Sequence, residues 1–128
     1  MSAALPASIV IVDDEVDHAI VIRRVLADVE VMTDPHQIEE RLATVPWDAL
    51  LLIDRMLAGR QSIDLLPRLL ERHLDLSVAV LSAALADIDR DRALAAGALA
   101  AVEKPGSLDA WRALLRELLG LHRARSVA

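Results

Sequence analysis

Cysteine, phenylalanine and tyrosine are absent from this chain, and tryptophan occurs only at Trp47 and Trp111. Without cysteine the fold can use neither a disulfide nor a thiolate metal site, and the redox compartment stays open. Aromatic residues make up 2% of the chain, whereas hydrophobic residues make up 55%. The core must therefore be built almost entirely from aliphatic side chains.

Lysine is nearly absent as well. Of the 14 basic residues, Lys104 is the single lysine and all the others are arginine. A lone lysine in an arginine-rich chain favours a site that needs a compact ammonium group rather than a planar guanidinium. The alternative is an ordinary surface charge that is lysine by chance, and the position of Lys104 in the fold decides between the two.

Long apolar runs and an excess of positive charge are also missing. No stretch approaches about 18 consecutive apolar residues, and the first seven residues lack the basic region of a signal peptide. The net charge is −6, whereas a general nucleic-acid binder needs a basic surface. We therefore expect one cytoplasmic domain over 1–128, with a core of about 8–119 and short flexible tails, that contacts neither membrane nor nucleic acid.

Apolar, β-branched runs alternate with segments of helical periodicity along the whole chain. This repeated strand–helix order predicts an α/β fold in which a parallel sheet carries helices on both faces. Residues 55–61 are expected to form a loop, and His122 to Ala128 a frayed tail, with His122 at the surface or at a helix end. Strands are expected at 8–12, 29–32, 49–54, 77–81 and 99–102, and helices at 15–27, 35–43, 62–73, 87–96 and from 108 onward.

Polar residues follow four of these strands. Because parallel strands joined by right-handed crossovers end at one edge of the sheet, these side chains are expected to converge there. Two carboxylates about 4 Å apart repel by about 4 kcal/mol at an effective dielectric near 20, and Mg²⁺ with its preference for oxygen ligands relieves that repulsion. An anion could then dock on a carboxylate and form an aspartyl phosphate. The converging residues are Asp13, Asp14, Asp54, Ser82 and Lys104.

Four short motifs occur in a fixed order along the chain. They are Ile11-Val12-Asp13-Asp14-Glu15, Leu52-Ile53-Asp54, Leu81-Ser82-Ala83, and Ala95-Ala96-Gly97-Ala98 followed by Lys104-Pro105. Each motif is weak alone, but the ordered set resembles the response-regulator receiver domain of two-component signalling. The resemblance extends from about Ser8 to Leu119 and implies a flavodoxin-like doubly wound sheet of five parallel strands in the order 2-1-3-4-5.

The resemblance also implies a set of residue roles. Asp54 would accept a phosphoryl group from a histidine kinase or phosphotransfer protein, and Ser82 and Lys104 would contact its oxygens. Mg²⁺ would be held by Asp13, Asp14, Asp54 and the backbone carbonyl of Met56, and the Lys104–Pro105 peptide bond would be cis. Such a domain assists its own phosphorylation and hydrolysis without being an enzyme that acts on other substrates. It would signal through altered contacts with a downstream protein.

Several positions depart from the family pattern. The usual aromatic residue three positions before the lysine is Ala101, the usual proline after the acceptor is Ala58, the glycine four residues later is Ser62, and the residue after Lys-Pro is Gly106.

Two alternatives to a phosphorylated receiver therefore stay open. The first is a receiver-like binding scaffold that signals without phosphate. The second is a phosphatase with an aspartyl-phosphate intermediate, which Met56 opposes because such enzymes generally have a carboxylate just beyond the nucleophile. The last helix has one apolar face, which is compatible with a homodimer.

Overall fold

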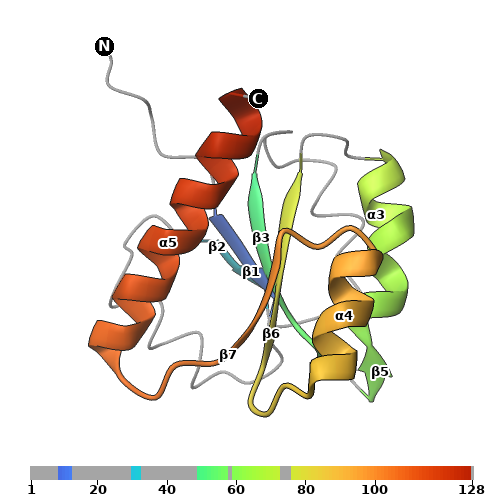
Figure 1. The fold of residues 1–128 in the computed structure, drawn as a ribbon, viewed down its shortest axis with the longest axis horizontal. Helices are drawn as coiled ribbons and strands as arrows, with labels where there is room; N and C mark the ends of the chain where they lie inside the picture. Colours follow the sequence, from blue (N-terminus) through green and yellow to red (C-terminus); the bar gives the residue numbers. More distant parts are fainter. Residues whose placement is uncertain (1–8, 13–29, 33–48, 58, 73–75, 128) are drawn as a thin grey trace.

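The computed structural model describes residues 9–12, 30–32, 49–57, 59–72 and 76–127. Its centre is a five-stranded sheet with the order β2-β1-β3-β6-β7, in which every neighbouring pair is parallel (Figure 1). In terms of the five predicted strands this is the order 2-1-3-4-5. The strands are β1 (Ile9–Val12), β2 (Glu30–Met32), β3 (Leu50–Asp54), β6 (Ser77–Ser82) and β7 (Ala100–Glu103).

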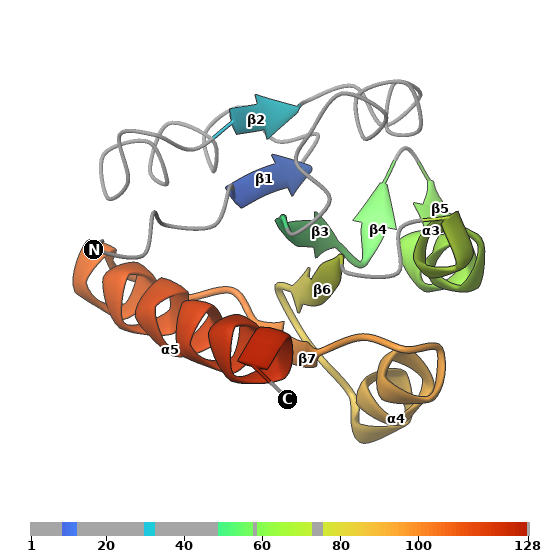
Figure 2. The ribbon, with the colours of Figure 1, turned by 90° about the horizontal axis from the view of Figure 1, so that it is seen from above.

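Three described α-helices cover the sheet. Helix α5 (Leu108–Val127) lies on one face, and α3 (Leu66–Arg72) and α4 (Asp87–Ala95) lie on the other, as Figures 1 and 2 show from two directions. The helices predicted at 15–27 and 35–43 lie outside the described residues. Within the part of the chain that is described, no helix combines the length and apolar character needed to cross a bilayer.

Alternation along the buried strands divides the core into two halves. All five residues of β3 are buried, and successive side chains point to opposite faces. Leu50 and Leu52 belong to the half under α5, whereas Leu51 and Ile53 belong to the half under α3 and α4. The apolar face of α5 packs against the sheet, and the dimer surface predicted on this helix stays a prediction. Its buried residues are Trp111, Leu115 and Leu118.

The segment after β3 is more ordered than the predicted loop. Strands β4 (Met56–Leu57) and β5 (Arg60–Gln61) form a short antiparallel ribbon, and Gly59 has the positive φ of 79° that its turn requires. A 3₁₀-helix, η2 (Ser62–Leu65), then leads into α3. Pro67 is the second residue of α3, in the first turn of an α-helix where proline is tolerated.

Gly97 ends α4 and brings it close to α3. Its φ is 107°, in the region that favours glycine, and a Cβ added there would lie 2.6 Å from Leu70 Cδ1. A larger residue at this position would adopt a strained backbone conformation and displace the end of the Leu70 side chain.

The end of α5 corrects the expected frayed tail. The helix continues to Val127, and His122 is 2% exposed rather than at the surface. His122 Nδ1 lies 2.6 Å from Ser77 Oγ, and Arg125 Nη1 donates to Ser77 Oγ at 2.9 Å and to the Leu76 carbonyl. These bonds hold the last turns of α5 against the beginning of β6. The prediction failed because the segment is polar in sequence but has buried polar partners in the fold.

Candidate functional site

Asp54 and Lys104 meet at the carboxyl edge of the sheet. Asp54 is the last residue of β3, Lys104 follows β7, and β6 lies between them. Lys104 Nζ donates to Asp54 Oδ2 at 3.1 Å, with side chains only 8% and 12% exposed. The ammonium compensates the carboxylate at the rim of an apolar core, where an unpaired charge would be costly. Lys104 is therefore not a simple surface charge.

Ser82 ends β6 beside this pair. It is 4% exposed, and its Oγ donates to the Ala84 carbonyl at 2.8 Å while accepting from Ala84 N at 3.3 Å. Two backbone hydrogen bonds join the three strand ends, from Lys104 N to the Ser82 carbonyl at 2.8 Å and from Arg55 N to the Leu81 carbonyl at 2.7 Å. The structure thus brings together Asp54, Ser82 and Lys104, the three residues predicted to bind the phosphoryl group.

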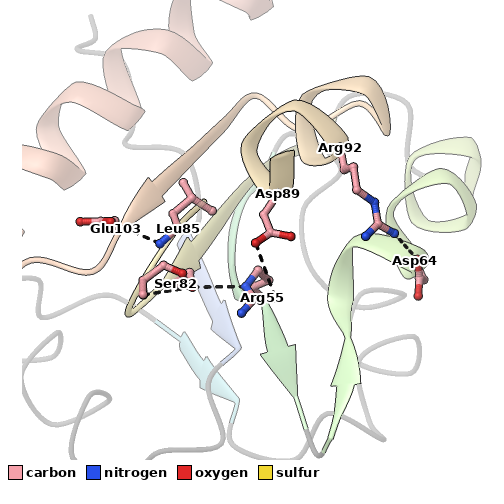
Figure 3. Close-up of polar contacts among 8 residues, drawn as sticks. Arg55, Asp64, Ser82, Leu85, Asp89, Arg92 and Glu103 are labelled. Atoms are coloured by element: carbon pink, nitrogen blue, oxygen red, sulfur yellow. Dashed lines mark hydrogen bonds and ion pairs between the residues drawn. The ribbon is translucent and has the colours of Figure 1, made fainter. Parts of the chain in front are cut away.

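Arg55 belongs to the same site, although its charge alone predicts a solvated side chain. Its Nε donates to Ser82 Oγ at 3.3 Å, and its Nη1 forms an ion pair with Asp89 Oδ2 of α4 at 3.9 Å (Figure 3). The Arg55 and Asp89 side chains are 24% and 19% exposed. The signal in the sequence is the alternation along β3, because Arg55 follows Asp54 and so points to the face on which α4 lies.

Two further contacts fix the surroundings of Ser82. Glu103 Oε1 accepts from Leu85 N at 3.2 Å and holds the loop between β6 and α4 (Figure 3). Arg90 Nε of α4 donates to the carbonyl of Ala101 at 3.3 Å. Ala101, at the position where the family pattern has an aromatic residue, is 5% exposed and belongs to the core.

The predicted magnesium ligands are only partly within the described chain. Asp13 and Asp14 lie outside the described residues. Ala58, which stands where the family usually has proline, also lies outside them. Met56 lies in β4 with its side chain 37% exposed, and its carbonyl as a ligand stays a prediction. Among the described residues no three His, Cys, Asp or Glu side chains are grouped so that they could hold a metal. The structure therefore supplies one carboxylate of the predicted set, Asp54.

The prediction of a cis peptide bond between Lys104 and Pro105 is wrong. None of the described peptide bonds is cis. The trans form of a bond before proline is the more stable one by about 0.5–1 kcal/mol, and the approach of Lys104 to Asp54 is compatible with it.

Comparison with known proteins places these observations in a family. Residues 9–116 match the family described as the response regulator receiver domain. No curated protein matches the sequence significantly.

Solved structures of receiver domains share the fold. A CheY-like receiver domain from Methanospirillum hungatei JF-1 superposes with a TM-score of 0.79 at 18% identity, covering 94% of this chain and 99% of its own. The Francisella response regulator 1452 receiver domain has a TM-score of 0.78 at 23% identity, with 93% and 98% covered. A response regulator from Thermotoga maritima has a TM-score of 0.75 at 22% identity, with 91% and 99% covered.

Proposed function

Because this chain belongs to the response regulator receiver domains, we propose that it accepts a phosphoryl group on Asp54 and signals by changing its contacts with other proteins. The observation that carries the proposal is the 3.1 Å contact between Lys104 Nζ and Asp54 Oδ2, beside the hydroxyl of Ser82. A carboxylate, an ammonium and a hydroxyl at one edge form a binding place for a phosphoryl group attached to that carboxylate. The cytoplasm is the proposed location.

The proposed donor is a phosphohistidine of a histidine kinase or phosphotransfer protein. One carboxylate oxygen of Asp54 attacks the phosphorus, a P–O bond forms and the P–N bond breaks. The imidazole nitrogen leaves with the electron pair and takes up a proton from solvent. Lys104 and Ser82 then donate to the phosphoryl oxygens, at about 1.5–3 kcal/mol for each charge-assisted hydrogen bond.

Mg²⁺ is the proposed cofactor, held by Asp13, Asp14, Asp54 and the Met56 carbonyl. Oxygen donors of this kind are the ligands that Mg²⁺ prefers. Strand β1 pairs with β3 so that Val12 lies beside Ile53, and Asp13 follows Val12 in the chain just as Asp54 follows Ile53. When bound, the ion would neutralise charge on the phosphoryl oxygens during transfer.

Intact-mass analysis after incubation with Mg²⁺ and acetyl phosphate tests this proposal. We expect one added phosphoryl group, no addition to Asp54→Asn, and none when a chelator removes the metal. Asp64→Asn is the matched control, because Asp64 is an exposed carboxylate in η2 that pairs only loosely with Arg92. Asp64→Asn should be labelled like the wild type, and a labelled Asp54→Asn would refute the assignment.

A binding scaffold that works without phosphate is the second candidate, and Ala101 favours it. A buried alanine cannot change rotamer, so the usual aromatic readout of phosphorylation is missing at this position. Titration with Mg²⁺ and then beryllofluoride, followed by amide signals, separates the candidates. A scaffold would show no beryllofluoride-dependent shifts, whereas a receiver shows shifts at Ser82 and Lys104.

Phosphorylation-dependent dimerisation is one form that such a change of contacts can take. One similar structure is described as a beryllofluoride-activated NtrC4 receiver domain dimer, with a TM-score of 0.76 at 16% identity. For this chain we propose a downstream protein partner, and a second copy is one such partner. Light scattering with and without beryllofluoride distinguishes a dimer from a monomer.

A further inference from the structure

We propose that Arg55 transmits phosphorylation of Asp54 to α4, as a positioning residue that links Ser82 to Asp89. This inference rests on the proposed function, because it concerns how the same site is read out. Arg55 is the residue directly after the acceptor, yet its side chain reaches across to the beginning of α4 (Figure 3).

The geometry of Arg55 is that of a bridge. Its Nε donates to Ser82 Oγ at 3.3 Å, and its Nη1 lies 3.9 Å from Asp89 Oδ2 in the first turn of α4. About three quarters of the Arg55 side chain is shielded, since 24% is exposed, and Asp89 is 19% exposed. Screening by solvent is therefore weaker here than for surface pairs. The ion pair of Arg90 with Asp87 on the same helix is more exposed, with side chains 47% and 99% exposed.

The usual aromatic readout is missing in this chain, and Arg55 offers a different connection between the site and α4. Ala101 has no rotamer to change, and its carbonyl is already bound by Arg90 of α4. The loop between β6 and α4 is held at Leu85 by Glu103. Among the described residues, Arg55 has a side chain that contacts both Ser82 and α4.

Phosphorylation of Asp54 changes the hydrogen bonds of the Ser82 hydroxyl and therefore its contact with Arg55. The Ser82 hydroxyl has one hydrogen, which is donated to the Ala84 carbonyl at 2.8 Å. Donation to a phosphoryl oxygen on Asp54 requires that this bond be given up and that Oγ turn toward Asp54. Arg55 must then follow Oγ or release it, and either movement alters the ion pair with Asp89. The first turn of α4 is in this way sensitive to the state of Asp54.

Arginine suits this role because its guanidinium is a rigid fork. Nε and Nη1 can bind two acceptors in different directions at once, whereas a lysine ammonium is a single point charge on a flexible stem. Arg55→Lys therefore keeps the charge beside Asp54 but loses the bridge. The change separates electrostatic help to the phosphoryl group from transmission to α4.

The test is an amide-shift titration of wild type and two variants with Mg²⁺ and beryllofluoride. In wild type we expect shifts both at the site, at Ser82 and Lys104, and in α4, at Ile88 and Ala93. Arg55→Lys and Asp89→Asn should keep the site shifts while the α4 amides lose most of theirs.

Each variant has a matched control on α4. Arg92→Lys changes an arginine that pairs with Asp64 at the same 3.9 Å but is half exposed and remote from Ser82. Asp91→Asn removes the same charge as Asp89→Asn from an exposed position of α4. Both controls should shift like wild type.

The outcomes separate this inference from the proposed function. Full α4 shifts in both Arg55→Lys and Asp89→Asn would overturn the bridge while leaving phosphorylation at Asp54 intact. Loss of the α4 shifts in the controls as well would also overturn it, since any charge change on α4 would then suffice. A wild type that takes up no beryllofluoride would overturn the proposed function and the inference together.

Discussion

The two ends of β6 carry the same residue in two different settings. Ser77 begins the strand and Ser82 ends it, and they are only 1% and 4% exposed. Ser77 shares its face with Ala79 and Leu81 under α5, whereas Ser82 shares its face with Val78 and Val80 under α3 and α4. The serine and its burial are thus constant, and only the partners differ.

The partners decide what each serine does. Ser77 Oγ is bound by His122 and Arg125, which lie 45 and 48 residues away on α5. Arg125 donates to Ser77 Oγ, and the Ser77 hydroxyl and His122 Nδ1 share a second hydrogen bond at 2.6 Å. Ser82 Oγ instead binds the adjacent loop at Ala84 and the Arg55 side chain. One end of the strand is an anchor, and the other has partners that can be exchanged.

The largest effect is expected at the carboxyl edge, from Lys104→Gln. Loss of one preorganised donor to the phosphoryl oxygens should slow phosphorylation about 10²–10³-fold. Stopped-flow measurement of phosphorylation by acetyl phosphate gives this rate. Circular dichroism checks that the variant is folded, because the change removes the ammonium that compensates the Asp54 carboxylate at the rim of the core. Rates equal to wild type would remove Lys104 from the mechanism.

The next largest effect is expected at the opposite edge, from His122→Ala. The change removes the His122 partner of the buried Ser77 hydroxyl and opens a cavity, so the free energy of unfolding should fall by about 2–3 kcal/mol. Urea denaturation measures the loss. Phosphorylation of the folded variant should be unchanged, with Arg123→Ala as an exposed control on the same helix. A slower phosphorylation of His122→Ala would show that the two edges are not separate in function.

A smaller effect on stability is expected from Ser82→Ala. Its hydroxyl is bound mainly by the local loop, so we expect a loss of about 1 kcal/mol or less in urea denaturation. Its effect should appear in signalling, because beryllofluoride should no longer shift the amides of α4. Ser77→Ala is the matched variant at the other end, and it should cost more stability and leave the α4 shifts intact. If Ser82→Ala cost more stability and Ser77→Ala abolished the α4 shifts, the distinction between the two ends of β6 would be wrong.

The smallest effect is expected from Ser62→Ala. Ser62 is a third buried serine, to be compared with Ser77 and Ser82. Ser62 is 1% exposed, and its Oγ has no hydrogen-bond partner in the structure as described. A buried hydroxyl without a partner carries a desolvation cost, so its removal should raise the free energy of unfolding by up to about 1 kcal/mol. A clear destabilisation would mean that Ser62 has a partner beyond the described residues.

The sequence predicted the sheet and part of the site well, for a local reason. Buried runs such as Leu50–Asp54 have one physical solution, a strand covered on both faces, and parallel strands end at one edge. Asp54, Ser82 and Lys104 could therefore be brought together without coordinates. Asp13, Asp14 and Met56 as magnesium ligands stay predictions from the same reasoning.

The sequence was misleading where a polar residue acquires a distant partner. His122 looks like part of a frayed tail, and Arg55 looks like a solvated charge. The alternation along β3 gives the face to which Arg55 points, but it does not identify Ser82 and Asp89 as its partners. Glu103 gives no signal at all, although it holds the loop at Leu85. Short-range patterns indicate which face a side chain occupies, but they do not say what lies opposite.

The amino-acid sequence by itself determined the α/β class, the strands of the sheet and the edge at which Asp54, Ser82 and Lys104 gather. Backbone conformation and alternation follow from neighbours along the chain, so these features could be derived residue by residue. Only the tertiary structure decided that Ser77 is held by α5 and that Arg55 joins Ser82 to Asp89. Those contacts span 27 to 48 residues and exist only because packing of the helices on the sheet brings their ends together.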